Sequence, residues 1–315
     1  MSRPYRGRLA PSPTGQLHLG HARTYLVAWL RARAAAGSIV MRMEDLDGPR
    51  VVPGAAEAIA GDLNWLGLDW DEGPAAGGPT GPYVQSERGD RYERALDALR
   101  AGGLTYPCTC SRKEIAAHAS APHGVRDLGV RYPGTCRDAP PRSDRAASTR
   151  FRMPEPPPSF EDGLHGRVDA SAWGGDFVLR RADGTWSYQL AVVVDDSEMG
   201  ITEVVRGDDL LPSTPRQIAL FRALGRPVPR FYHLPLVLGP DGERLSKRHG
   251  AVAIADHREA GLRPTQIVGW LAATLGLAPR GAERTPGDLL TTFAGAELSL
   301  EATTADLLES LRGGS

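Results

Sequence analysis

The stretch YRGRLAPSPTGQLHLGHARTYLVAWLRARAAAGSIVMRMEDLD, residues 5–47, contains the pattern that decides the fold. Residues 5–10 form a predicted short strand, and a Pro/Gly turn follows it. Apolar residues at helical spacing predict a helix over about 19–36, with Gly37 as its C-cap. Residues 38–43 are a second apolar strand, with acidic residues directly after it. A strand–helix–strand unit of this length is typical of the crossover in a parallel α/β sheet.

The composition excludes several classes of protein. Hydrophobic residues make up 41% of the 315 residues, which is enough for a buried core. The 37 basic and 38 acidic residues give a formal net charge of −1, so a uniformly basic coat for nucleic acid is excluded, although a local basic face is not. The sequence contains no apolar run typical of a secretory signal. It also contains no apolar run of about 18 residues, the length that a membrane span needs. Three cysteines do not make a disulfide framework, so a cytoplasmic protein is expected.

The composition changes in the middle of the chain, where residues 106–160 contain all three cysteines and several proline clusters. This composition indicates a loop-rich insertion. The arginine-rich residues 137–152 are interpreted as a solvated loop, with a contact to RNA as the alternative. Beyond it, the patterns predict a helix over 213–224, a buried strand over 231–238 and a helix over 264–275. The expected division is a main domain of residues 1–105 and 176–255, an inserted subdomain of residues 106–175, and a short helical region of residues 256–315.

Two histidines, His18 and His21, stand at the start of the first predicted helix. Histidines at positions i and i+3 lie on one face of the first turn, where N–H groups and the helix dipole favour an anion. Gly20 between them permits a ligand to approach the backbone closely. This arrangement suits a phosphate chain whose negative charge grows in a transition state. The alternative is a pair of ordinary surface histidines.

A second basic motif, ERLSKR of residues 243–248, follows the strand predicted over 231–238. Arginine is the default cation of this chain, because only Lys113 and Lys247 among its 37 basic residues are lysines. Lysine carries a compact ammonium on a flexible stem, which can follow a moving phosphate better than the wide guanidinium fork. Lys247 is therefore interpreted as a phosphate ligand, with a solvated turn as the alternative.

Four motifs resemble, in order, the signatures of class I glutamyl-tRNA synthetases. RLAPSPTG of residues 8–15 with HLGHART of residues 18–24 resembles the first signature, and RLSKR of residues 244–248 resembles the lysine-bearing second one. Between them, RMEDLD of residues 42–47 and VDDSEMGITEVVRG of residues 194–207 also match. The resemblance covers residues 5–255, and it implies a Rossmann-like, doubly wound parallel sheet of the class I aminoacyl-tRNA synthetase type.

The resemblance implies that ATP with Mg²⁺ activates L-glutamate, whose carboxylate attacks the α-phosphate without a protein nucleophile. Glutamate has two anionic groups and one cationic group, and the implied site offers two arginines and one carboxylate. Arg8 and Tyr188 would hold the side-chain carboxylate, Ser12 and Glu44 the α-amino group, and Arg206 the α-carboxylate, with Leu9, Ala10 and Pro11 completing the glutamate site. The ATP site would consist of His18, Gly20, His21, Ser246 and Lys247, of which His18, His21 and Lys247 would be catalytic. Tyr188 lies in an apolar run, so a core position is its alternative.

The C-terminal part of the chain narrows the resemblance. About 65 residues follow Arg248, too few for the helical anticodon-binding region of a full-length glutamyl-tRNA synthetase. The chain therefore resembles the truncated glutamyl-Q branch of the family, which activates glutamate without tRNA and transfers it to queuosine, the modified anticodon nucleoside of tRNA(Asp). A monomer without membrane contact is expected. Two alternatives stay open: a shortened synthetase that charges a tRNA 3′ end, and a catalytically silent RNA-binding paralogue.

The cysteine-containing insertion is similar to the zinc site of that branch. The implied ligands of one Zn²⁺ per chain are Cys108, Cys110, Tyr132 and Cys136. Tetrahedral zinc with thiolate ligands stabilises loop-rich segments. The 21 residues between Cys110 and Tyr132 leave His118 and His123 as alternatives for the fourth ligand. Three unrelated reduced thiols are the alternative to a metal site.

Overall fold

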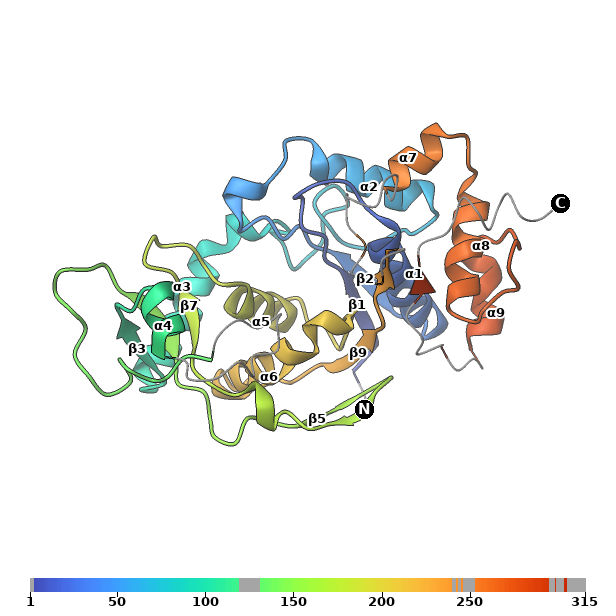
Figure 1. Cartoon of the computed structure of the whole chain (residues 1–315). Coiled ribbons are helices and arrows are strands. Elements are labelled where there is room, and N and C mark those ends of the chain that lie inside the picture. Colours follow the sequence, from blue (N-terminus) through green and yellow to red (C-terminus); the bar gives the residue numbers. More distant parts are fainter. Residues whose placement is uncertain are drawn as a thin grey trace. The chain divides into compact units, whose positions relative to one another are not determined.

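Two parallel strands, β1 (Arg6–Leu9) and β2 (Ser38–Met41), are joined by helix α1 (Leu19–Ala34), as residues 5–47 predict. A second parallel pair consists of β8 (Glu203–Gly207) and β9 (Arg230–Leu234). The Thr202 amide, just before β8, donates to the Arg6 carbonyl of β1 (2.8 Å), so the two pairs lie edge to edge (Figure 1). The predicted parallel α/β sheet is confirmed.

The computed structural model describes residues 3–118, 131–239, 242, 245, 253–294, 298 and 303–304. The chain divides into two compact units. The first consists of Met1–Val84, Ile201–Asp208 and Arg230–Ser315, and the second of Gln85–Gly200 and Asp209–Pro229. The four parallel strands named above belong to the first unit, whereas the cysteines belong to the second.

Helix α1 supplies much of the core of the first unit, because Leu26, Val27 and Leu30 are fully buried. The helix packs on β1 and β8 and also contacts α8 (Pro264–Thr274). Arg23 of α1 fixes this second contact by donating to the Thr274 hydroxyl (3.1 Å). The remaining elements of this unit are α2 (Ala55–Trp65), β10 (Val237–Leu238), α7 (Ile254–Glu259), α9 (Leu290–Phe293), β11 (Thr303–Thr304) and the 3₁₀ turns Gly48–Arg50 and Gly287–Leu289.

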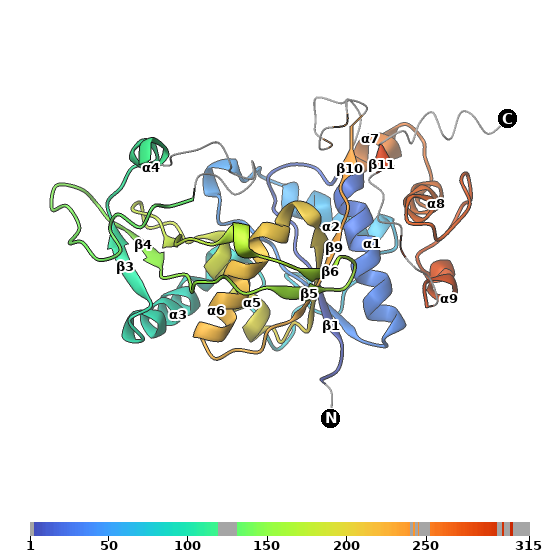
Figure 2. The ribbon, with the colours of Figure 1, turned by 60° about the horizontal axis from the view of Figure 1, so that its bottom comes forward.

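The second unit contains an antiparallel sheet in the order β3 (Thr105–Cys108), β4 (Ser148–Phe151), β7 (Phe177–Arg180). Helices α5 (Tyr188–Glu198) and α6 (Thr214–Ala223) pack against each other in this unit (Figure 2). Its other described elements are α3 (Gly89–Ala101), α4 (Arg112–His118), the hairpin of β5 (Phe160–Asp162) and β6 (Gly166–Val168), and the 3₁₀ turns Gln85–Arg88 and Ser171–Trp173. The 3₁₀ turn Asp208–Ser213 also belongs to it, except for its first residue. None of the helices described in either unit has the length and apolar character needed to cross a membrane.

Two local predictions are wrong. Helix α1 has Ala35 as its C-cap, and Ala36 rather than Gly37 has the positive φ of 48° that follows it. Gly37 is needed for close packing instead, because a Cβ there would lie 2.5 Å from the Tyr5 carbonyl oxygen. The strand predicted over 231–238 is interrupted, since β9 ends just before Pro235, which has no N–H to donate to a ladder.

Candidate active site and metal centre

His18 and His21 lie together at the start of α1. His18 is the N-cap, and its Nδ1 accepts a hydrogen bond from the His21 backbone N–H (3.4 Å). The two rings stack with their centroids 3.7 Å apart; His18 is half-buried and His21 is exposed. An N-cap side chain satisfies a first-turn amide, and here it also holds both imidazoles at the end of the helix that favours anions. The structure thus brings the two predicted phosphate ligands onto one face.

Gly20 occupies the second position of α1, beside the His18 ring. A Cβ at this position would lie 3.2 Å from both Cε1 and Nδ1 of His18. A larger residue would therefore displace the imidazole. The His18 ring alone therefore explains why position 20 is a glycine, whether or not a ligand also approaches the backbone there.

Ser246 and Lys247, predicted to bind ATP, lie outside the described residues. On their C-terminal side, Ala253 forms a β-bridge with the N-cap residue of α1. On their N-terminal side, Leu245 is buried and donates its N–H to the Val237 carbonyl of β10 (3.1 Å). Both flanks of the predicted lysine-bearing segment are therefore attached to the first unit, one of them directly at the histidine pair.

Two buried arginines lie on neighbouring strands of the first unit. Arg8 of β1 is 5% exposed and donates to the Val205 carbonyl of β8 (3.0 Å). Arg206 of β8 is also 5% exposed, and its Nε donates to Nε2 of His233 on β9 (3.0 Å). Because His233 accepts this bond, its Nε2 carries no proton and its imidazole is neutral. The two guanidiniums assigned to the carboxylates of glutamate are thus fixed in position by the sheet.

Glu44 and Ser12 follow the ends of β2 and β1. The Glu44 N–H donates to the Pro11 carbonyl (2.9 Å), so the two segments continue side by side beyond the strands. The Glu44 carboxylate accepts from Arg42 Nη2 (2.9 Å), and the Arg42 side chain is fully buried. A carboxylate accepts more than one donor, so this pairing is compatible with a bound ammonium group. Ser12 is exposed, and Leu9, Ala10 and Pro11 connect it to β1.

Tyr188 is the first residue of α5, in the second unit, and its side chain is half-buried. Ser187 caps this helix by accepting from the Leu190 N–H (3.4 Å). The motif at the end of α5 has a structural role, because Asp195 is fully buried. It accepts from Arg88 (2.5 Å), Gln85 (2.7 Å) and Tyr92 (3.0 Å). The third family motif therefore stabilises the second unit through at least one of its residues.

The three cysteines form one cluster in the second unit, with their sulfurs within 4.8 Å of one another. Tyr132 Oη lies 3.4 Å from Cys108 Sγ and 3.7 Å from Cys110 Sγ. Cys110 Sγ lies 3.4 Å from Cys136 Sγ. Ligand atoms at about 2.3 Å from a tetrahedral Zn²⁺ lie roughly 3.8 Å apart, so this donor set fits the ion.

Tyr132 is fixed among the sulfurs by two further contacts. Its hydroxyl accepts from the Cys136 backbone N–H (2.8 Å), and the Arg150 guanidinium lies over its ring, 3.8 Å from the centroid. The side chain of His118 and the whole of His123 lie outside the described residues.

Three side chains of this cluster differ in how readily they lose a proton. Burial raises the pKa of the Tyr132 phenol, and burial together with Cys136 raises the pKa of the Cys110 thiol to about 11. Burial opposes ionisation of Cys136 too, but its hydrogen bonds with Tyr132 and the Thr109 backbone lower its pKa to about 7. Cys136 therefore ionises first, and a divalent cation bound here would lower the pKa of the other thiols as well.

Sequence reasoning does not find two residues that orient the predicted glutamate ligands. His233 and Arg42 are fully buried, and they bind Arg206 and Glu44, respectively. His233 meets Arg206 only because the parallel register of β8 and β9 places them opposite each other. The sequence does give one chemical indication for His233, because a histidine buried in the apolar run FYHLPLVL needs a polar partner.

Comparisons with known proteins agree with this geometry. Residues 5–285 match the family of tRNA synthetases class I (E and Q), catalytic domain. The chain is 53% identical to the glutamyl-Q tRNA(Asp) synthetase of Symbiobacterium thermophilum and 49% identical to that of Nitratidesulfovibrio vulgaris, each over 98% of both chains. Its structure is similar to that of a glutamate tRNA ligase from Elizabethkingia meningosepticum in complex with its amino acid (TM-score 0.83, 28% identity). That match covers 98% of this chain and 68% of the ligase.

These matches extend over the four motifs and over the parallel sheet on which the buried arginines lie. They confirm the resemblance drawn from the motifs and the predicted class I fold. The chain belongs to the class I tRNA synthetases of the E and Q type.

Proposed function

We propose that the chain activates L-glutamate with ATP and transfers the glutamyl group to queuosine in the anticodon loop of tRNA(Asp). Four side chains of the first unit support the activation step. The imidazoles of His18 and His21 stack at the start of α1, and the buried guanidiniums of Arg8 and Arg206 lie on adjacent strands. The transfer step is supported by the relatives that match nearly the full chain and are named for it.

In the activation step, a carboxylate oxygen of glutamate forms a bond to the α-phosphorus of ATP, and pyrophosphate leaves with the electrons of the broken P–O bond. No side chain has to act as a nucleophile, so the rate depends on positioning and on stabilising the growing negative charge. His18, His21 and Lys247 would steady the phosphates, with Gly20 and Ser246 completing the ATP site. Mg²⁺ bound with ATP would neutralise part of the phosphate charge.

Glutamate recognition would use one buried cation for each carboxylate. Arg206, held by His233, would bind the α-carboxylate, and Arg8 with Tyr188 would bind the side-chain carboxylate. Glu44 and Ser12 would bind the α-amino group, and Leu9, Ala10 and Pro11 would line the site. Charge-assisted hydrogen bonds of this kind are about twice as strong as neutral ones. A substrate with a neutral side chain would leave the Arg8 guanidinium without its anion.

The cysteine cluster would hold one Zn²⁺ through Cys108, Cys110, Tyr132 and Cys136. The ion would act as a structural clip that joins β3 to the loop before β4. Tyr132 is the preferred fourth ligand because its oxygen lies among the sulfurs.

The expected domain boundaries stay a prediction: a catalytic domain of residues 1–105 and 176–255, an insertion of residues 106–175 and a C-terminal helical region of residues 256–315. A monomeric state and a cytoplasmic location are also predictions. The helices α7, α8 and α9 support the third of these segments.

The test uses labelled glutamate, ATP and tRNA(Asp) with and without queuosine. Glutamate-dependent exchange of pyrophosphate into ATP is expected without any RNA. Label is expected on tRNA(Asp) only when it carries queuosine, and removal of the 3′-terminal adenosine should leave that labelling intact. Absence of exchange with glutamate, both with and without RNA, would exclude the activity and favour the silent paralogue.

A second candidate is a synthetase that charges a tRNA 3′ end. It is favoured by 45% identity to the glutamate–tRNA ligase of Anaeromyxobacter sp., over 84% of this chain and 56% of that ligase. The same experiment separates the two candidates. Charging of tRNA(Glu) at its 3′ end, with no label on queuosine-bearing tRNA(Asp), would establish the second one.

A further inference from the structure

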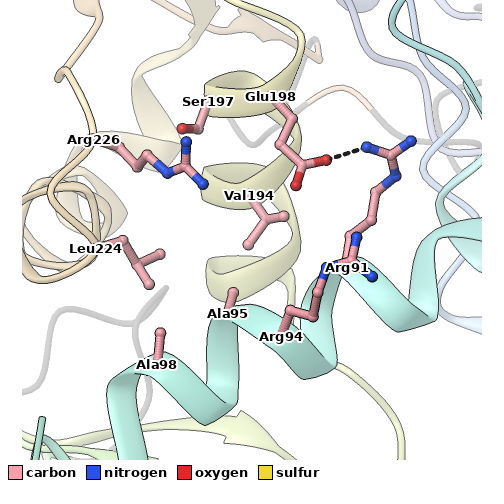
Figure 3. A pocket seen from close by; sticks show the side chains of 9 residues that line it. All are labelled: Arg91, Arg94, Ala95, Ala98, Val194, Ser197, Glu198, Leu224 and Arg226. Carbon is pink, nitrogen blue, oxygen red and sulfur yellow. Dashed lines mark hydrogen bonds and ion pairs between the residues drawn. The ribbon is translucent and has the colours of Figure 1, made fainter. Parts of the chain in front are cut away.

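A cavity of about 230 Å³ lies within the second unit, and none of its lining residues is assigned above to glutamate, ATP or metal. Arg91 and Arg94 of α3 line it on one side, and Ser197 and Glu198 of α5 on another (Figure 3). Arg226, in the segment after α6, lies beside Ser197 (Figure 3). Three guanidiniums from two separate segments therefore surround one small space.

The charge around this cavity is not balanced. Glu198 is the one acidic residue that lines it, and it is already shared by Arg91 (2.6 Å) and Arg88 (3.0 Å). Arg94 and Arg226 are exposed and make no hydrogen bond or ion pair through their side chains with any residue that the structure describes. The Ser197 hydroxyl also has no hydrogen-bond partner in the described part of the chain. The cavity therefore has an excess of donors and of positive charge.

The arginine-rich residues 137–152 offer a contrast within the same unit. Arg142 pairs with Asp144 (3.3 Å) and Glu114 (3.4 Å), and Arg145 pairs with Glu114 (2.9 Å). Neighbouring carboxylates thus neutralise these arginines, although residues 137–152 stand out in the sequence as arginine-rich and the cavity arginines do not. The excess cations of the cavity are set by the fold, because α3 and the segment after α6 are far apart in the sequence.

We propose that this cavity binds a phosphate group of the RNA substrate; the proposal rests on the proposed function for the identity of that polymer. Two guanidinium forks match the two unesterified oxygens of a phosphodiester. Whole-ligand pockets typically measure about 300–1,000 Å³, so a cavity of this size suits one group of a larger molecule. The apolar wall formed by Ala95, Ala98, Val194 and Leu224 gives an attached ribose a surface to pack on. Inorganic phosphate and pyrophosphate share this chemistry and are the competing source.

The test combines Arg94→Gln with Arg226→Gln and measures binding of queuosine-bearing tRNA(Asp) at several salt concentrations. Loss of one phosphate contact reduces the slope of log K against log salt by about 0.7–0.9, which is roughly a five- to eightfold loss of affinity at about 0.1 M salt. Arg100→Gln is the matched control, because Arg100 is an exposed arginine of the same helix that pairs with Asp97 and does not line the cavity. Arg94→Gln alone is measured in parallel and carries the test even if the double variant folds poorly.

Glutamate-dependent pyrophosphate exchange without RNA separates this proposal from the proposed function. We expect the variants to keep wild-type exchange while they lose RNA affinity. Unchanged RNA binding and salt slope in variants with wild-type exchange would overturn the proposal and leave the proposed function standing. A second measurement tests whether inorganic phosphate or pyrophosphate raises the unfolding temperature of the wild-type protein but not of the variants. That result, together with unchanged RNA binding, would overturn RNA as the source of the phosphate.

Discussion

Two sets of arginines, one in each unit, are held in opposite ways. In the first unit, Arg206 and Arg42 are buried and fixed by His233 and Glu44, so their donors are oriented before any ligand arrives. In the second unit, Arg94 and Arg226 are exposed on the wall of a cavity and make no ion pair with the described residues. Fixed donors suit a small ligand of constant shape, because ordering costs about 0.5–1.5 kcal/mol per mobile side chain. Flexible donors tolerate the varied positions of a polymer backbone.

The largest expected effect concerns Lys247, the lysine of the predicted ATP site. Lys247→Ala should lower kcat for pyrophosphate exchange by about 10²–10³-fold, because the ammonium stabilises charge that develops only in the transition state. The glutamate KM should change little. Lys113→Ala, at the only other lysine, is the control and should have wild-type rates. A change confined to the glutamate KM would contradict the role of Lys247.

Removal of a fixed arginine should give the opposite kinetic pattern. Arg206→Ala or Arg8→Ala removes a charge-assisted hydrogen bond of about 1.5–3 kcal/mol, which corresponds to a glutamate KM roughly 10- to 150-fold higher. The exchange rate at saturating glutamate should fall much less. Arg167→Ala, at an exposed arginine of the β5–β6 hairpin, should leave the KM unchanged. Full-strength glutamate binding by Arg8→Ala would refute the assignment of the pocket.

His233 tests whether Arg206 must be held in place. His233→Phe removes the hydrogen bond that orients Arg206 but keeps the guanidinium in the site, so we expect a glutamate KM only roughly two- to tenfold higher, with kcat nearly unchanged. His233→Asn keeps an acceptor for the Arg206 Nε and should recover part of the loss. Equal defects in both variants, in kcat as well as KM, would indicate a packing role only.

Metal removal should affect the second unit more than the chemistry. Wild-type protein is expected to contain about one zinc per chain, and Tyr132→Phe should retain less of it than His118→Ala. Cys136→Ser should lose the metal and melt at a lower temperature, while glutamate-dependent exchange changes less than about twofold at low temperature. Analysis of purified protein by atomic emission and by thermal unfolding measures both effects. Less than a few tenths of a zinc per wild-type chain would remove the site.

The motifs at strand ends could be predicted because chemistry and spacing are both local there. His18 and His21 are three residues apart, so a single helix turn is enough to bring their rings together. The pairing of Arg206 with His233 depends on the register of two strands that are separated by a helix, which the sequence does not display. The cavity arginines are harder still, because neither Arg94 nor Arg226 belongs to a motif and only folding makes them neighbours.

The smallest expected effect concerns His257, a buried side chain without a hydrogen-bond partner among the residues that the structure describes. His257 of α7 is 2% exposed, and neither of its ring nitrogens has a hydrogen-bond partner in the described part of the chain. Burial lowers its pKa, and Asp256 opposes this only partly. This side chain therefore takes up a proton at a lower pH in the folded protein than in the unfolded chain.

The sign of the pH dependence follows from this lowered pKa. Between about pH 6.5 and the lower pKa of the folded state, the unfolded chain binds more protons at His257 than the folded chain, so the free energy of unfolding should fall as the pH decreases through this range. One proton contributes a slope of at most about 1.4 kcal/mol per pH unit. His257→Leu should reduce the slope measured by urea unfolding, whereas His165→Leu, at an exposed histidine, should not. If the free energy of unfolding of His257→Leu depends on pH as steeply as that of the wild type, water reaches the imidazole. The contrast between paired and unpaired buried groups would then not apply to α7.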